Sequence, residues 1–453
     1  MFGRILSLGV RRVAPAVALV GLAVSPAIST SASSGQGHFY LQPFHTSPVF
    51  AAAYSRPFQF PPPSVCEEGI GLACYTPQII RTAYNVPSNL TGAGQTIVIV
   101  DAFGDPTVAS DLHTFDTEFG LADPKLTVYY PSGKPTWSVN NGNDTGWASE
   151  ISLDVQWSHA MAPGANIDLV VAKSNQDTDL EYAQSWAIHQ RLGNILSESF
   201  GETESNIPDG AGNWSSMASH SDYQLAAQNG MSVFVSAGDW GSNFYGFPGS
   251  TGNSPIASFP ANDPNVTAVA GTDLFAADNG AYQGEYVWND SALGQCPFGC
   301  AYGVFGATGG AASQFYRVPQ YQHGTGYAWR TTADVAWNAS VYTAVMVYLG
   351  FYGQGGGNGF YFFGGTSEGA PSWAGITALA DQAAGHGLGN LNPKMYALAS
   401  YGGGSPTFQD VTFGQNGLFT GTPPGYNAGT GYDVSSGLGS PNVTNLINAL
   451  ISH

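Results

Sequence analysis

A serine stands where a glycine-rich strand end turns into a helix. Residues 363–373 read FGGTSEGAPSW and place Ser367 at the start of a predicted helix that continues over residues 373–384. Free backbone N–H groups and the helix dipole favour a developing negative charge at that point. Pro371 fits the first turn, where its missing N–H is not needed. The pattern favours a nucleophilic serine, and its alternative is a Gly-Thr-Ser turn that only caps a helix.

A serine hydroxyl needs a base, and two carboxyl groups on one predicted helix can supply it. Glu150 and Asp154 stand four residues apart, so both side chains leave the same helix face and can touch. Two adjacent carboxyls cannot easily both ionise, so one pKa rises and the pair keeps a shared proton into mildly acidic pH. Glu150 is therefore the candidate base for Ser367, and Asp154 would orient it. A solvated helix face that carries two acids is the alternative.

An aspartate follows the end of an apolar strand in the segment SAGD, residues 236–239. Sites in open α/β sheets assemble at strand ends. A protonated carboxylic acid donates a hydrogen bond, and a site that works at low pH can use one to hold an oxyanion. Asp239 is thus a candidate for the oxyanion hole, together with the Ser367 backbone N–H. A Gly-Asp turn with a capping carboxylate is the alternative.

Short, β-branched apolar runs alternate with helix-like stretches, and these elements must position the candidate residues. The runs are continuously apolar, as strands buried on both faces are. We predict strands at residues 96–100, 167–172, 194–197, 232–236 and 266–269, and helices at 150–161, 180–192 and 217–229. The alternation predicts an α/β fold with a mostly parallel central sheet.

The composition limits the classes of partner. Charged residues make up 9% of the chain, and 31 acidic residues against 12 basic ones give a formal net charge of -19 and a pI near 4.5. A strongly acidic chain is a poor ligand for nucleic acid. Its self-repulsion fades as carboxylates protonate, which suits an acidic medium.

The N-terminus predicts export. Residues 1–32 contain arginines, then an apolar run, then small residues, which is the layout of a secretory signal peptide cleaved near residue 32. The run is too short to span a membrane, so we expect a soluble, secreted, extracellular protein without a membrane partner. Residues 33–74, rich in Pro and Phe, are interpreted as an extended arm or short pro-segment, and residues 75–453 as one large domain. We expect a monomer.

Four cysteines form two close pairs, Cys66 with Cys74 and Cys296 with Cys300. In an exported chain, two local disulfides are the simplest interpretation, although four cysteines allow three connectivities. A zinc site is the alternative, but the spacings do not match paired Cys-x-x-Cys motifs.

Together these segments resemble the sedolisin family, the serine-carboxyl peptidases, over most of the chain from Tyr75 to about Asn442. Blocks typical of the family occur in order, among them GAGQTIVIVDAFGDP, ILSESFGETE, FVSAGDWGS, SFPANDPNVTAVAGT and GGTSEGAPSWAG. The resemblance implies a subtilisin-like fold, peptidase activity at acid pH towards proteins or peptides, and a triad of Ser367, Glu150 and Asp154 with Asp239 in the oxyanion hole. Cleavage would be either internal or by release of tripeptides.

The resemblance also implies two further sites. Residues 197–201 would include the strand against which the substrate pairs, which makes Ser197, Ser199 and Gly201 candidate substrate-binding residues. A calcium site is expected near the C-terminus, because two carboxylates and glycine-bent backbone carbonyls suit a hard cation. Its expected ligands are the side chains of Asp410 and Asp433 and the carbonyls of Val411, Gly429 and Gly431.

One departure from the family is that only about forty residues separate the predicted signal peptide from Tyr75, where relatives carry a folded pro-domain. Three other interpretations remain open. An ordinary subtilisin would use Asp101, His113 and Ser367. A glycoside hydrolase would use Glu150 with an aspartate, which leaves the serine motif unexplained. A catalytically silent homologue would bind peptides only.

Overall fold

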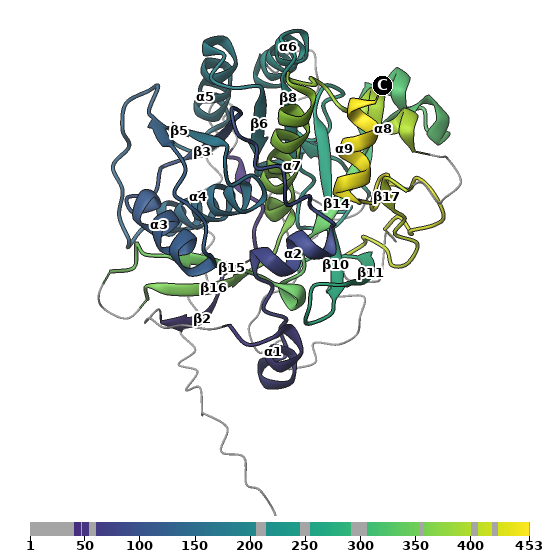
Figure 1. Ribbon diagram of the computed structural model, residues 1–453. Coiled ribbons are helices and arrows are strands. Elements are labelled where there is room, and N and C mark those ends of the chain that lie inside the picture. The colour runs from purple at the N-terminus through teal and green to yellow at the C-terminus, as the bar shows by residue number, and fades with distance from the viewer. Residues whose placement is uncertain are drawn as a thin grey trace, which may run out of the picture.

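A central sheet organises the molecule (Figure 1). The computed structural model describes residues 40–46, 48–53, 60–204, 214–244, 254–290, 306–353, 357–399, 406–418 and 425–452. The sheet has the strand order β11-β10-β8-β6-β3-β5-β4, and β14 pairs with β10. All of its pairings are parallel except that of β11 with β10. Its strands are β3 (Thr96–Ala102), β4 (Leu126–Tyr129), β5 (Asn166–Ala172), β6 (Ile195–Glu198), β8 (Ser232–Ser236), β10 (Thr267–Ala276), β11 (Tyr282–Val287) and β14 (Val335–Asn338).

The strands form where continuous apolar runs predict them. The side chains of β3 are buried from Ile97 onward, and all five residues of β8 are buried, as a sheet covered on both faces requires. The predicted mostly parallel α/β fold is therefore confirmed. The pattern did not single out β14, whose four residues are too short a run to identify by period alone.

Helices cover both faces of the sheet (Figure 1). Helices α4 (Gly142–Met161) and α7 (Gly369–Ala384) pack against each other and enclose the larger core with α3 (Val108–Phe119). Helices α5 (Asp177–Gln190) and α6 (Trp214–Gln228) pack together over the smaller core on the other face. The remaining α-helices are α1 (Pro63–Ile70), α2 (Pro77–Ala83), α8 (Asn392–Leu398) and α9 (Val443–Ile451). None of the helices in the described ranges is long and apolar enough to cross a membrane.

Shorter strands surround the central sheet. A three-stranded sheet has the order β1 (Gln42–Pro43), β7 (Phe200–Thr203), β9 (Ser258–Phe259). A second has the order β15 (Val345–Leu349), β16 (Gly359–Phe363), β2 (Val49–Ala53). Two hairpin-like pairs complete the set, β12 (Ala311–Arg317) with β13 (Trp329–Thr332) and β17 (Phe408–Gln409) with β18 (Ser440–Pro441).

The segment expected to be an extended arm is only partly extended. It contributes β1 and β2, but it also contains α1, which starts with a proline at its first turn and ends at the left-handed Gly71. A disulfide joins Cys66 to Cys74, as predicted. The predicted signal peptide, residues 1–32, and the pair Cys296 and Cys300 lie outside the described residues.

Candidate active site

Two buried helices and two strand ends bring the candidate residues together. Strand β16 leads through Gly364 and Gly365 into a 3-10 turn, Thr366–Glu368, and then into α7. Ser367 is fully buried in this turn. Because α4 packs against α7 and this turn, Glu150 and Asp154 face the same region.

The hydroxyl of Ser367 is linked to Asp154 through Ser199. It donates a hydrogen bond to the Ser199 carbonyl at 3.2 Å. The Ser199 hydroxyl lies 2.9 Å from Asp154 Oδ1, to which it donates, and 3.4 Å from the Ser367 carbonyl. Sequence reasoning assigned Ser199 to substrate pairing but did not foresee this bridge, since a single serine carries no signal for it.

Glu150 is buried without a hydrogen-bond donor in the described part of the chain. Neither of its carboxyl oxygens makes a bond of standard geometry. Burial raises the pKa of Glu150 well above its ordinary value, and repulsion from Asp154 and Asp101 raises it further. The neighbouring Ser367 hydroxyl acts in the opposite direction and lowers this pKa, although its contact with Glu150 falls short of hydrogen-bond geometry. Glu150 therefore binds a proton readily beside the serine.

Asp154 is the partner of Glu150. Burial raises the pKa of Asp154 well above its usual range, while the hydrogen bond from Ser199 and the adjacent Glu150 carboxyl lower it. Asp154 Oδ2 has no donor among the described residues, and neither do the oxygens of Glu150. Two such carboxyls satisfy each other only when one of them carries a proton, so a shared proton accounts for the arrangement.

Asp239 follows β8 and lies against the serine turn. Its Oδ1 accepts hydrogen bonds from the Thr366 backbone N–H and hydroxyl, both at 2.8 Å. Its Oδ2 is buried without a donor among the residues described. Burial raises the pKa of Asp239 to about 8, against the effect of the Thr366 bonds. Below that pH the carboxyl is protonated, and its free oxygen can donate a hydrogen bond.

The backbone N–H of Ser367 binds one peptide carbonyl, and Asp239 lies close to the same glycine turn. Ser367 N donates to the Phe44 carbonyl oxygen at 2.9 Å. Gly365, at φ +113°, makes this approach possible, because a Cβ there would lie 2.5 Å from both the Phe44 oxygen and Asp239 Oδ2 and 2.6 Å from His45 Cα. The arrangement has the donors that an oxyanion hole requires.

The three residues expected to bind substrate lie in different settings. Gly201 belongs to β7 and pairs with Gln42, and the Ser199 carbonyl accepts the Phe44 N–H at 3.0 Å. Ser197 instead lies in the central sheet, between Ile99 and Phe234 on the neighbouring strands. Ser199 and Gly201 thus face an extended segment, and Ser197 does not.

Asp101 and His113, the residues that an ordinary subtilisin would use, lie in different environments. The His113 side chain is 64% exposed and pairs with Asp123 at 2.8 Å, on the surface of the molecule. Asp101 is fully buried, and burial together with Asp154 and Glu198 raises its pKa well above normal. The histidine near the site is His45, whose Nε2 lies 3.9 Å from Glu150 Oε2, and burial lowers its pKa.

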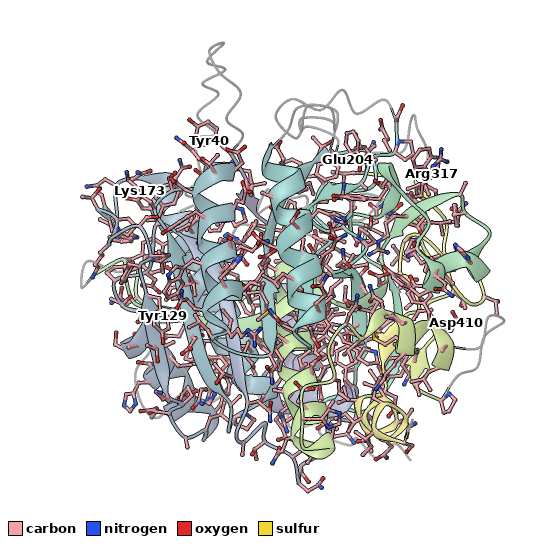
Figure 2. All side chains as sticks on the ribbon, turned by 90° about the horizontal axis from the view of Figure 1, so that it is seen from above. Tyr40, Tyr129, Lys173, Glu204, Arg317 and Asp410 are labelled. Atoms are coloured by element: carbon pink, nitrogen blue, oxygen red, sulfur yellow. A yellow bond between two sulfur atoms is a disulfide. The ribbon has the colours of Figure 1, made fainter. Side chains whose placement is uncertain are left out.

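A hydrogen bond joins the two segments that carry the expected calcium ligands, residues 410–411 and 429–433. Gly431 N donates to Asp410 Oδ2 at 3.0 Å, and Gly429 N donates to Asp433 Oδ2 at 3.1 Å. The carbonyls of Val411, Gly429 and Gly431 accept no hydrogen bond from the described residues, so their lone pairs are available to a cation. No cluster of three or more His, Cys, Asp or Glu side chains suited to a metal occurs in the described ranges. In Figure 2, Asp410 lies in a different part of the molecule from Tyr40, which precedes β1.

Known proteins are similar to this chain in sequence and in fold. The profile of the subtilase family matches residues 139–399. Kumamolisin of Bacillus sp. (strain MN-32) is 31% identical over 389 residues, which cover 83% of this chain and 64% of kumamolisin. Sedolisin of Pseudomonas sp. (strain 101) is 30% identical over 384 residues, which cover 82% of this chain and 60% of sedolisin. The chain thus spans about three fifths of the length of these curated relatives.

A solved structure extends the comparison to the fold. Pseudomonas sedolisin, described as a serine-carboxyl proteinase complexed with two molecules of pseudo-iodotyrostatin, has a TM-score of 0.71 at 28% identity, covering 84% of this chain and 98% of that one. The expected subtilisin-like fold is confirmed. Since the family profile covers more than half of the sequence, the chain belongs to the subtilase family, and within it resembles the sedolisins.

Proposed function

We propose that this protein is an acid-acting serine-carboxyl peptidase. The observation that carries the proposal is that the Ser367 N–H binds one peptide carbonyl and the Oδ2 of Asp239, which lacks a donor among the described residues, lies close to the same glycine turn. Glu150, whose two carboxyl oxygens lack donors among the described residues, lies beside the same serine, and Asp154, whose Oδ2 lacks a donor there, lies beside Glu150. The names of the relatives, sedolisin and kumamolisin, agree with this assignment.

The proposed reaction is acyl transfer. Ser367 Oγ attacks the substrate carbonyl carbon, Glu150 takes the hydroxyl proton and passes it to the leaving amine, and water then releases the acyl-enzyme. Asp154 holds Glu150 and shares its proton. The Ser367 N–H and protonated Asp239 stabilise the oxyanion.

The pH dependence follows from these protonation states. Asp239 donates only while protonated, and its pKa of about 8 sets the upper limit for this donor. The Glu150–Asp154 pair must keep a shared proton, and mutual repulsion opposes the loss of that proton until the pH rises. We therefore expect turnover to be greatest in acid and to fall towards neutrality.

The test is peptide hydrolysis measured from about pH 2 to pH 8. The wild type is expected to have its maximum below about pH 6.5. Ser367→Ala should lose turnover by roughly 10⁴- to 10⁶-fold while keeping its melting temperature. A maximum at neutral or alkaline pH would favour a histidine-dependent subtilisin, and a stable but inactive wild type would favour a silent peptide-binding homologue.

We also propose one structural Ca²⁺ near the C-terminus. Asp410 and Asp433 would supply carboxylate oxygens, and Val411, Gly429 and Gly431 would supply carbonyls. The support is that these three carbonyls accept no bond from the described residues. The ion would cross-link segments that are separate along the sequence and so stabilise the fold.

Export and substrate class complete the proposal. The N-terminal signal-peptide pattern supports secretion, and we propose protein or peptide substrates, cleaved internally or as tripeptides. Assaying a blocked and an unblocked version of one peptide distinguishes these, because release of tripeptides requires a free N-terminus.

A further inference from the structure

The residue that follows the candidate nucleophile is a buried carboxyl that the proposed mechanism does not use. Glu368 is the last residue of the serine turn, Thr366–Glu368, and its side chain is fully buried. A carboxyl directly before a helix commonly accepts hydrogen bonds from the first N–H groups of that helix. Glu368 makes no such bond to α7, all of which the structure describes. Its carboxyl must therefore have another partner.

That partner is the end of strand β14. Trp337 Nε1 donates to Glu368 Oε1 at 3.1 Å, and Asn338 Nδ2 donates to Glu368 Oε2 at 3.1 Å. Trp337 and Asn338 are the last two residues of β14, which packs against the serine turn and α7 (Figure 1). Gly369 permits this close approach, because a Cβ there would lie 2.6 Å from Val269 Cγ1 and 3.3 Å from Trp337 Cβ.

The two donor residues are themselves held in fixed positions. Asn338 Oδ1 accepts hydrogen bonds from Thr343 Oγ1 at 2.7 Å and from Leu274 N at 3.1 Å. The Asn338 N–H donates to the Tyr84 hydroxyl at 2.9 Å. The Trp337 ring stacks on the Tyr84 ring with their centroids 4.0 Å apart. The carboxyl in the serine turn is thus bound to a rigid part of the sheet.

Ser367 is held through both of its neighbours in the chain. Thr366, which precedes it, donates from its backbone N–H and its hydroxyl to Asp239, both at 2.8 Å. Glu368, which follows it, is bound to β14. Because the peptide units on either side of Ser367 are fixed, its backbone N–H and the base of its side chain have little freedom to move.

The carboxyl of Glu368 brings no charge to this turn in acid. Its bonded partners, Trp337 and Asn338, are both uncharged side chains. Burial raises the pKa of Glu368 well above its ordinary value, while these two bonds lower it. At the acid pH of the proposed reaction the carboxyl is therefore protonated and does not repel a developing oxyanion.

We propose that Glu368 is a positioning residue, which ties the serine turn to β14 and so keeps the Ser367 hydroxyl in place beside its base. The inference rests on the proposed peptidase function and adds to it a residue that acts through Ser367 without touching the substrate. A carboxyl with only a structural role would contribute to the stability of the fold and leave the reactivity of the serine unchanged.

The test measures kcat and KM for one peptide at the pH of the wild-type maximum. Glu368→Leu removes the acceptor, so kcat should fall by about 10- to 100-fold while KM changes by less than about threefold. Glu368→Gln keeps an acceptor of the same shape and should retain kcat within about threefold. Equal losses in both variants would show that the two hydrogen bonds are not the cause, and would overturn the inference.

A peptide aldehyde gives a readout that a structural role would not change. The Ser367 oxygen bonds to the aldehyde carbon and the hydroxyl proton moves to the former carbonyl oxygen, so binding depends on the placement of that hydroxyl. The matching peptide amide reports binding to the cleft alone. Glu368→Leu should weaken the aldehyde by the same factor as kcat and leave the amide within about twofold. Equal weakening of both inhibitors, or of neither, contradicts the proposal.

Asp381→Leu is the matched control. Asp381 is also a fully buried acid on α7, and its Oδ1 accepts the Leu388 N–H at 2.9 Å. Its replacement should lower the melting temperature and leave kcat within about twofold of the wild type. A loss of kcat equal to that of Glu368→Leu would mean that any buried acid of α7 has this effect, and would refute a special role for Glu368.

Trp337→Phe keeps the inference testable even if Glu368→Leu does not fold. It removes one donor to Glu368 and keeps an aromatic ring against Tyr84, so kcat should fall by at least about threefold. A wild-type kcat in this variant overturns the inference. An active wild type with unchanged variants leaves the proposed function standing, whereas an inactive wild type removes both.

Discussion

The buried acids Glu150 and Asp334 have opposite surroundings. Asp334 receives two charged bonds from Arg330, at 2.7 and 2.5 Å, together with bonds from the Tyr396 hydroxyl and the Ala268 N–H, both at 2.8 Å. Glu150 receives no hydrogen bond in the described part of the molecule. Both side chains are fully buried.

The difference separates a structural carboxylate from a chemical one. A guanidinium and several donors around Asp334 replace the water that its carboxylate has lost. Glu150 is left with capacity for a proton and with a serine hydroxyl beside it, which suits a group that takes and returns protons. The number of hydrogen-bond donors around a buried carboxylate is thus a better guide to the role of that carboxylate here than its burial.

Replacing Glu150 by glutamine should give the largest effect on activity. Glu150→Gln keeps the shape but cannot accept a proton, so kcat should fall on the order of 10²- to 10⁴-fold. Stopped assays at the pH of the wild-type maximum measure this. The melting temperature should stay level or rise, because a carboxyl without hydrogen-bond donors has been removed. A variant that is active but unstable would show that Glu150 has a structural role and not the role of a base.

Replacing Asp334 should have the converse effect. Asp334→Ala leaves the Arg330 guanidinium buried without its partner, so the free energy of unfolding should drop by about 3–5 kcal/mol. Urea unfolding of the inactive Ser367→Ala background measures this without self-digestion. The double variant Arg330→Met, Asp334→Leu is the matched control and should recover part of the loss, whereas no loss in the single variant would mean that the ion pair is not structural.

A change of pH should alter the stability of the fold through the buried acids whose pKa, like that of Glu150, is raised. Burial raises the pKa of both Asp239 and Glu198 to about 8 and that of Asp290 to about 7. A carboxyl whose folded pKa is raised binds its proton more tightly in the folded state. Its stabilisation is therefore complete below the unfolded value of about 4 and is lost as the pH rises through the folded value. Calorimetry should show a melting temperature that falls from about pH 4 to pH 8.

Removing calcium should give the smallest of these effects. A chelator is expected to lower the melting temperature by several degrees, since loss of a ligand that binds only the folded state removes its stabilisation. Asp410→Ala should abolish the response to chelator. A melting temperature that chelator leaves unmoved would remove the metal from the proposal.

The sequence predicted those parts of the fold that local pattern decides. Strands β3 and β8 are continuous apolar runs, so their positions followed from composition, and the four-residue spacing of Glu150 and Asp154 was enough to place both on one helix face. The simplest pairing of neighbouring cysteines, Cys66 with Cys74, is likewise present, although the sequence left three connectivities open.

The remaining features depend on contacts between distant segments. The course of residues 40–46 is fixed by pairing with β7 and by the serine turn, and no period in the arm reveals it. The bridge from Ser199 to Asp154 joins residues 45 positions apart. Ser197 lies in the central sheet, on the strand that the apolar run at residues 194–197 predicts, so its assignment to the substrate strand conflicted with that prediction.

Helix α4 limits how this protein can be controlled. Every residue from Trp147 to Met161 is buried, so the part of the helix that carries both acids is packed against other residues on all its faces. Moving it would open the core, at a cost comparable to unfolding. Under the proposed mechanism, regulation would therefore act on the access of substrate to the site, because the helix that carries both acids has no room to move.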